Sequence, residues 1–137
     1  MKLNVHGCRG SVPVQSRSQI KYGGNTSCFQ VTFGKFQLFF DTGTGFRTAQ
    51  FGGPELIKII LYSHWHHDHI QGLAFNTNIF VPDQKILVAS GLSSADVSRQ
   101  TLQQYFSGSY FPIDVIGSLE NIIFHEFEYI KENFIND

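Results

Sequence analysis

Short apolar runs alternate with polar, glycine-rich stretches along the chain, and this pattern predicts strands joined by loops and short helices. Polar-apolar alternation over residues 2–8 predicts a first strand, and the Ser-, Gly- and Pro-rich stretch 9–27 predicts a long loop. Residues 28–33 and 35–43 have two further strand patterns, separated by a Gly-Lys step that is typical of a tight hairpin. The chain therefore begins to build a sheet within its first 43 residues.

The rest of the chain mixes strand and helix patterns. β-branched and apolar runs predict strands at 56–63, 85–90 and 121–130. A short helix is predicted over 45–53. A longer helix runs through 95–106, with Ser93 or Ser94 as its cap and an apolar face available from Val97, Leu102, Tyr105 and Phe106. Residues 131–137 read as a polar tail. Strands separated by helices predict an α/β fold.

Length and composition limit the classes of function. A chain of 137 residues fits one domain, residues 1–137. Ten Lys and Arg against eleven Asp and Glu give a formal charge of -1. The chain therefore has no excess of positive charge to attract a nucleic-acid backbone, and non-specific nucleic-acid binding is disfavoured. No apolar stretch is long enough for a signal peptide or a membrane span, so we expect a cytoplasmic protein. Cys8 and Cys28 are expected to be reduced, buried small hydrophobes.

Four of the six histidines lie in the stretch Ser63-His64-Trp65-His66-His67-Asp68-His69, directly after the predicted strand 56–63. His64 and His66 are two apart and point to one side of an extended backbone, so both imidazoles can bind one metal ion. Asp68 and His69 follow after the chain turns, and they can face a second ion. Imidazole combined with carboxylate suits Zn²⁺, Fe or Mn.

A metal-free explanation is also open: an exposed, coincidental histidine run, or core histidines satisfied by the backbone. Burying several imidazoles without partners is costly, and a mixed His and Asp run at a strand end has no packing rationale. The metal interpretation is therefore favoured. Trp65 and His67, at the alternate positions, are expected to pack or to support the ligands rather than to bind metal.

The pattern His64-x-His66-x-Asp68-His69 after an apolar strand resembles the HxHxDH signature of the metallo-β-lactamase superfamily. Further segments resemble landmarks of its phosphodiesterase and transfer-RNA 3′-end ribonuclease branch: residues 7–13, 22–28, 40–45, 69–73 and 110–112. The resemblance implies the first half of an αβ/βα sandwich, a mixed sheet with helices on one face.

The resemblance also implies a two-metal hydrolase, in which a hydroxide bridging two divalent ions attacks phosphorus or a carbonyl carbon. Zinc is the first choice of metal, with Mn or Fe as alternatives. His64 and His66 would bind one ion, Asp68 and His69 the other, and Asp68 would also act as the catalytic carboxylate. A small-molecule or nucleotide-like phosphodiester is the preferred substrate, and a carboxylic ester or thioester is the alternative.

Residues around the motif have supporting roles in this interpretation. Asp41 resembles the family's carboxylate beneath the site, although an Asx turn would explain it equally well. Arg9 and Asn25 would line the substrate side, with Arg9 on a phosphate, although both could simply shape a solvated loop. His6 and His125 are isolated in strand patterns and are expected to be core or edge histidines.

The resemblance also exposes missing ligands. The family completes its site with a later His, a bridging Asp and a final His, and no residue after His69 matches these positions. We therefore expect an incomplete domain whose open sheet face associates with a second copy, as a homodimer, or with a missing C-terminal half. The alternative to an enzyme is an inactive half-domain that binds metal partially.

Overall fold

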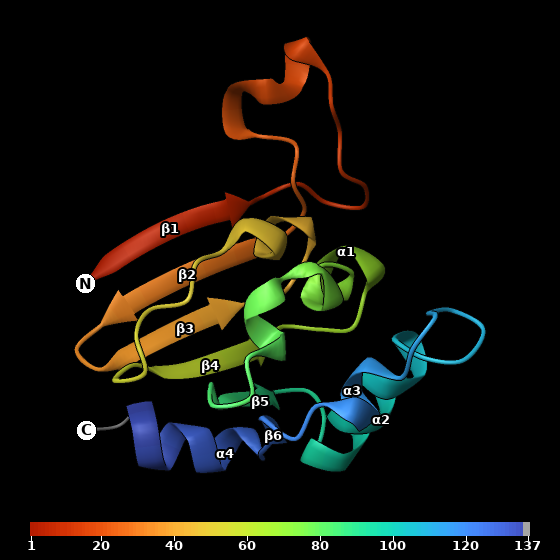
Figure 1. The fold of residues 1–137 in the computed structure, drawn as a ribbon. Coiled ribbons are helices and arrows are strands. Elements are labelled where there is room, and N and C mark those ends of the chain that lie inside the picture. Colours follow the sequence, from red (N-terminus) through yellow and green to blue (C-terminus); the bar gives the residue numbers. More distant parts are fainter. Residues whose placement is uncertain (136–137) are drawn as a thin grey trace.

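Six strands form one mixed sheet in the computed structural model of the chain, which describes residues 1–135. In both sequence and spatial order they are β1 (Lys2–Gly7), β2 (Cys28–Phe33), β3 (Phe36–Phe40), β4 (Ile57–Tyr62), β5 (Ile86–Ser90) and β6 (Ile122–Phe124) (Figure 1). β2 is antiparallel to β1 and β3, whereas β3 to β6 are parallel. The predicted mixed α/β sheet is confirmed.

Short helices and helical turns lie between these strands, and two more follow β6. The α-helices are α1 (His67–Ile70), α2 (Ala95–Tyr105), α3 (Val115–Ser118) and α4 (Phe127–Ile130). The 3₁₀ turns are η1 (Arg17–Tyr22), η2 (Thr44–Thr48), η3 (Leu73–Phe75) and η4 (Thr77–Phe80), and η5 (Lys131–Ile135) is a π-helical turn. Ser94 caps α2, since its Oγ accepts a hydrogen bond from the Val97 amide at 3.3 Å. Within residues 1–135, no helix has the length and apolar character needed to cross a membrane.

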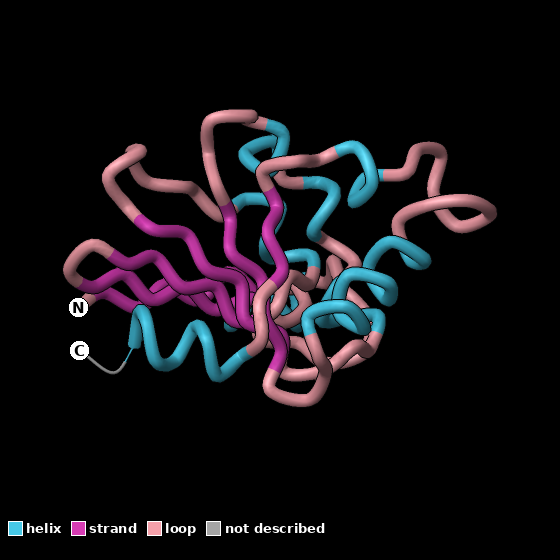
Figure 2. The backbone as a smooth tube through the Cα atoms, turned by 90° about the horizontal axis from the view of Figure 1, so that it is seen from below, coloured by secondary structure: helices cyan, strands magenta, loops and turns pink. Residues whose placement is uncertain are grey.

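The alternation of side chains along the strands creates two apolar faces. On the first face, Phe39, Ile60 and Val88 belong to the main core, together with Leu102 of α2. On the second face, Leu38, Ile59 and Leu61 cluster with Ile130 of α4. Figure 2 shows α4 lying along the strand layer. Helices therefore cover both faces, and the expectation of helices on one face alone was wrong.

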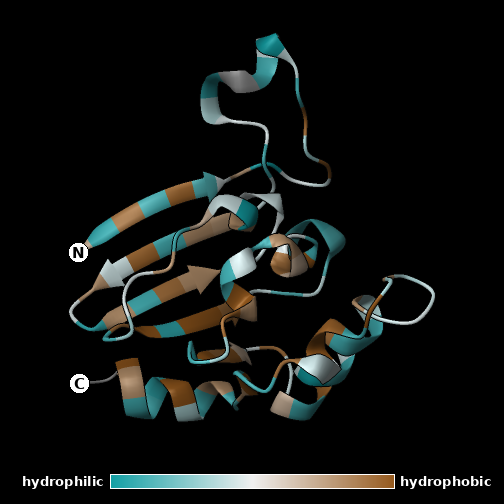
Figure 3. Cartoon of the chain, in the orientation of Figure 1, coloured by the Kyte–Doolittle hydropathy of each residue, from teal (hydrophilic) through white to brown (hydrophobic). Residues whose placement is uncertain are grey.

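Part of the second face has no cover within the described chain. The register places Leu3 and Val5 of β1 on the same face as Leu38 and Phe40 of β3. Leu3, Val5 and Phe40 are 61%, 55% and 38% exposed. Figure 3 shows the alternation of hydrophobic and hydrophilic residues along β1. We call Leu3, Val5 and Phe40 the open face.

The strand predicted over 121–130 was wrong in its second half, because β6 ends at Phe124 and α4 follows. Phe127, Ile130 and Phe134 recur at spacings of three and four, which is a helical period, and all three pack on the second face. The predicted polar tail is likewise corrected, since η5 carries Phe134 into this cluster. Residues 136–137 of that tail lie outside the described residues.

Two further expectations on single residues were wrong. Cys8 is exposed, because it follows an irregularity of β1 between Val5 and Gly7, whereas Cys28 is buried as predicted. Val97 is 49% exposed, because the buried stripe of α2 runs through Ser98 and Leu102 instead. Both cysteines are free thiols.

Candidate metal centre

The histidine motif lies at the edge of the sheet where the parallel strands β3 and β4 end. β4 ends at Tyr62, His66 is the extended residue that precedes α1, and α1 begins at His67. The Asp41 amide donates to the Leu61 carbonyl at 3.0 Å, which fixes the end of β3 beside the end of β4. Adjacent parallel strands therefore deliver Asp41 and the motif to one place.

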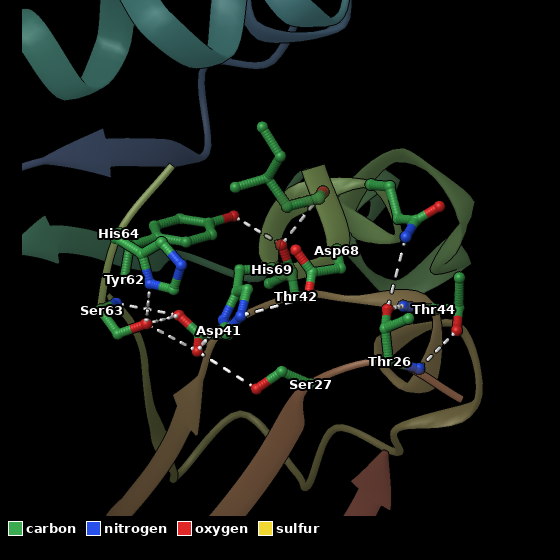
Figure 4. Close-up of polar contacts among 12 residues, drawn as sticks. Thr26, Ser27, Asp41, Thr42, Thr44, Tyr62, Ser63, His64, Asp68 and His69 are labelled. Carbon is green, nitrogen blue, oxygen red and sulfur yellow. Dashed lines mark hydrogen bonds and ion pairs between the residues drawn. The ribbon is translucent and has the colours of Figure 1, made fainter. Parts of the chain in front are cut away.

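Asp41 is a buried hydrogen-bond acceptor at the base of the centre (Figure 4). Its Oδ1 accepts from the backbone amide of Ser63 at 2.9 Å, and the Ser63 hydroxyl lies 2.9 Å from both carboxylate oxygens. The Ser27 hydroxyl donates to Oδ2 at 3.2 Å. The backbone of Asp41 has a φ of 60°, a left-handed conformation that Asp adopts more readily than most residues.

His69 is held by that carboxylate. Its Nδ1 donates to Asp41 Oδ2 at 2.7 Å, and its Nε2 lies 3.4 Å from Asp68 Oδ2. A carboxylate on one imidazole nitrogen fixes the ring and leaves the other nitrogen as the potential ligand atom. Asp41 thus contacts the imidazole of His69, and its role as a supporting carboxylate stays a prediction.

The rings of His64 and His66 gather beside His69. The His64 ring centroid is 4.4 Å from that of His66 and 4.0 Å from that of His69. The Ser63 hydroxyl lies 2.9 Å from His64 Nδ1, so His64, like His69, has its Nδ1 bound within the chain. The structure brings the four predicted ligands, His64, His66, Asp68 and His69, to one site. Their roles as ligands stay predictions.

Asp68 is tied to the long loop between β1 and β2. The Ser11 amide donates to Asp68 Oδ2 at 2.8 Å, and Ser11 has a φ of 69°. This hydrogen bond lowers the pKa of the Asp68 carboxyl below its ordinary value, and the neighbouring His69 and His64 act in the same direction. Asp68 therefore stays ionised next to the imidazoles.

The two alternate residues of the motif point elsewhere. His67 Nδ1 is hydrogen-bonded to the Tyr105 hydroxyl of α2. Trp65 donates from Nε1 to the Ser93 hydroxyl at 2.8 Å and packs on Tyr62 with ring centroids 4.9 Å apart. These are the packing contacts that the sequence pattern predicts for both residues.

Arg9 and Asn25 lie in the same loop as Ser11, and the Arg9 amide donates to the Asn25 carbonyl at 3.1 Å. The Asn25 side chain donates to the His6 carbonyl at 3.4 Å and accepts from the Thr44 hydroxyl at 3.2 Å. Asn25 therefore ties the loop to β1 and η2. The predicted substrate contacts of Arg9 and Asn25 stay predictions.

His6 and His125 contribute to other contacts. His6 lies on the edge strand β1, with its Nε2 2.6 Å from Gln30 Oε1. His125 follows β6 and stacks on Tyr129, with ring centroids 4.4 Å apart. The position of His6 on an edge strand is as predicted, whereas His125 lies beyond its strand.

Backbone hydrogen bonds of Thr42 hold α1 against the end of β3. The sequence pattern did not predict these hydrogen bonds. The Thr42 amide donates to the His69 carbonyl, and the Gly72 amide donates to the Thr42 carbonyl, both at 2.7 Å. A Cβ on Gly43 would lie 2.3 Å from the Asp68 carbonyl oxygen. Glycine is therefore required sterically where the turn meets the motif.

The four predicted ligands have the chemistry of a metal centre, but their side chains do not form a coordination shell around one ion. Three imidazoles and a carboxylate are ligands that suit Zn, Mn or Fe. Among the side chains of residues 1–135, no group of three or more His, Cys, Asp or Glu is arranged to hold a metal ion.

Comparison with known proteins shows the fold. No family model and no curated protein matches the chain. The metallo-β-lactamase fold protein YhfI from Bacillus subtilis is 20% identical, with a TM-score of 0.51 over 79% of this chain and 41% of that one. Human tRNase Z, short form (ELAC1), is 19% identical, with a TM-score of 0.54 over 92% of this chain and 42% of that one. The chain therefore spans about two fifths of the length of either protein, and over that length it has the metallo-β-lactamase fold.

Proposed function

We propose that the chain carries part of the two-metal centre of a metal-dependent hydrolase, and that the substrate is a phosphodiester. One observation carries the proposal: His69 is fixed through Nδ1 by the buried Asp41, while its Nε2 lies next to Asp68. A hydrogen bond of this kind on the far nitrogen is the usual support of a metal-binding imidazole.

The ligand roles follow from position along the motif. His64 and His66 would hold one ion, and Asp68 and His69 would hold the other. We expect zinc, with Mn or Fe as alternatives that the same donors accept. When bound, two such ions lower the pKa of water toward about 7 and stabilise the negative charge of the transition state.

Asp68 would orient the attacking water and help with proton transfer. The Ser11 amide donates to its Oδ2 at 2.8 Å and holds the carboxylate in place. The same hydrogen bond occupies part of Oδ2, so Oδ1 offers the more accessible lone pairs. Asp68 would therefore accept the hydrogen bond of the water at Oδ1.

The preference for a phosphodiester rests on Arg9 and on one structural neighbour. Arg9 lies two residues before Ser11, in the loop that is hydrogen-bonded to Asp68, and its guanidinium could bind a phosphate from there. The neighbour tRNase Z is a ribonuclease by its name. A carboxylic ester or thioester is the second candidate.

The remaining ligands would come from outside residues 1–135. The described side chains form no closed group of three ligands, and the chain spans about two fifths of its structural neighbours. A later part of the same gene product, or a second copy of the chain, would complete the centre. Under the alternative, the chain is an inactive half-domain that binds metal partially and self-associates.

The test is hydrolysis of bis-p-nitrophenyl phosphate by the full-length gene product with added Zn²⁺ or Mn²⁺. We expect turnover that falls strongly in His66→Ala and Arg9→Ala, and that is unchanged in His125→Ala, a histidine outside the centre. Equal rates for His66→Ala and the unmodified protein would overturn the proposal. Faster cleavage of p-nitrophenyl acetate, insensitive to Arg9→Ala, would favour the carboxylic ester instead.

A further inference from the structure

A cavity of about 390 Å³ lies beside the candidate metal centre, between α1, η3 and the C-terminal end of α2. Aromatic rings make up most of its wall, namely Phe75, Tyr105, Phe106, Tyr110 and Phe111. His67 and Gln71 of the α1 region add the polar groups. The cavity is therefore mostly aromatic, with polar atoms on the side nearest the centre.

Two of the aromatic residues that line the cavity are largely exposed to solvent. Phe75 is 57% exposed and Tyr110 is 76% exposed. Phe111 is half-buried, and its ring meets Phe106 edge to face at 5.4 Å and Phe75 at 5.9 Å between ring centroids. The cavity wall thus combines packed and exposed aromatic rings, on which another flat ring can stack.

The polar groups can bind the edge of such a ring. The Nδ1 atom of His67 is hydrogen-bonded to the Tyr105 hydroxyl, so Nε2 is the ring nitrogen that can bind a ligand. The Gln71 amide donates to the Thr26 hydroxyl at 3.4 Å, which leaves Gln71 Oε1 as an acceptor. A mostly apolar pocket with two polar side chains in its wall is typical of a small-molecule site.

The position of His67 connects this cavity to the metal centre. His67 lies between His66 and Asp68 in the chain, yet its ring contacts Tyr105 of α2 while its neighbours belong to the centre. The first turn of α1 thus carries His67 into the wall of the cavity and Asp68 and His69 into the centre.

We propose that this cavity binds the nucleobase of a nucleotide phosphodiester whose phosphate lies at the centre formed by His64, His66, Asp68 and His69. This inference rests on the proposed function for the placement of the phosphate. The base stacks on the exposed aromatic rings, and its polar edge hydrogen-bonds to Gln71 and His67. An acyl chain would leave both of these polar groups unused.

The test is the binding of adenosine to the metal-free chain in the presence of a chelator. Isothermal titration calorimetry and NMR measure this binding. Adenosine carries no phosphate, so its binding reports the cavity alone. We expect Tyr110→Ala and Phe75→Ala to raise Kd by roughly 5- to 150-fold, the usual value of a base-aromatic stack. Tyr110→Phe keeps the ring and should bind like the unmodified chain.

Phe80→Ala is the matched control, because Phe80 is a 41% exposed aromatic residue that does not line the cavity. Circular dichroism checks that each variant is folded. Absence of adenosine binding, equal binding by Tyr110→Ala and Phe75→Ala, or tighter binding of N-acetylphenylalanine amide would each overturn the proposal.

The two proposals can fail separately. Adenosine binding that depends on Tyr110, together with a full-length gene product that cleaves no phosphodiester, would support the nucleobase cavity and overturn the hydrolase. Phosphodiester cleavage that is unchanged by Tyr110→Ala, together with no adenosine binding, would overturn the cavity and support the hydrolase.

Discussion

The imidazole of His69 donates from Nδ1 to Asp41 Oδ2 at 2.7 Å, across 28 residues of sequence. The orientation of this ring is therefore set by the end of β3 and not by α1, the short helix that carries it. Asp41 also accepts two hydrogen bonds from Ser63, the residue that precedes the motif. One buried carboxylate thus positions both ends of the histidine motif.

Asp41→Asn should weaken both the fold and metal binding. The amide nitrogen cannot accept from His69 Nδ1, so one partly buried donor loses its charged partner. We expect the free energy of unfolding, measured in urea without metal, to fall by about 1.5–3 kcal/mol. Zinc affinity should fall roughly 10- to 100-fold. Asp83→Asn, at an exposed position, is the control and should change neither quantity.

Gly43→Ala should displace the motif, because its new Cβ would meet the Asp68 carbonyl oxygen at 2.3 Å and the Ser27 carbonyl oxygen at 2.7 Å. We expect a loss of about 1–3 kcal/mol in thermal or urea unfolding, typical of overpacking. Gly91→Ala is the matched control, because no atom lies within 4 Å of its Cβ position. Equal stability of the two variants would contradict this close approach.

The two thiols should differ in reactivity. Burial, with a smaller effect of Asp41, raises the pKa of Cys28 from 9.0 to about 12, whereas Cys8 is exposed. Iodoacetamide at mildly alkaline pH should modify Cys8 alone in the native chain, and both thiols after unfolding. Peptide mass spectrometry identifies which cysteine is alkylated. Rapid labelling of Cys28 in the native chain would contradict its burial.

The raised pKa of Cys28 also predicts a pH dependence of stability. The unfolded thiol ionises near its ordinary value of 9.0, while the folded thiol stays protonated up to about 12. The stabilisation is therefore fully present below pH 9.0 and is lost as the pH rises toward about 12. Cys28→Ala should flatten this alkaline slope in urea unfolding, and an unchanged slope would rule Cys28 out as its cause.

The open face should drive association of the chain with itself. Leu3 and Val5 present apolar surface on the edge strand β1, and such surface favours pairing with another copy. We expect light scattering after size exclusion to show dimers that dissociate in Val5→Asp. Asn4→Asp, on the opposite face of the same strand, should leave them intact. A chain that is monomeric at every concentration would contradict the expectation.

The part of the fold near the motif could be predicted because its signals are local. The apolar run of β4 stands out in the sequence, and the histidine cluster follows directly at its end. Ser94 and the hairpin at Gly34 are equally local signals. The C-terminal segment was mispredicted because FHEFEYI fits an alternating strand as well as a helix, and only packing against Ile59 and Leu61 decides for α4.

The supporting contacts of the centre could not be predicted, since they join distant residues. Ser11 reaches Asp68 across 57 residues through a backbone amide, which any residue type except proline could supply. Ser63 borders the motif, but only the fold shows that it bridges Asp41 and His64. Sequence therefore identifies the potential ligands, and tertiary structure identifies what orients them.

Zinc content after dialysis is the measurement that tests the metal centre most directly, comparing the unmodified chain with His66→Ala and His67→Ala. His66 is a predicted ligand, whereas the adjacent His67 is turned toward Tyr105. We predict that the unmodified chain and His67→Ala retain zinc, with at most one tightly held ion per chain, and that His66→Ala loses most of it. Equal zinc content in all three proteins, or zinc lost only from His67→Ala, would contradict the account.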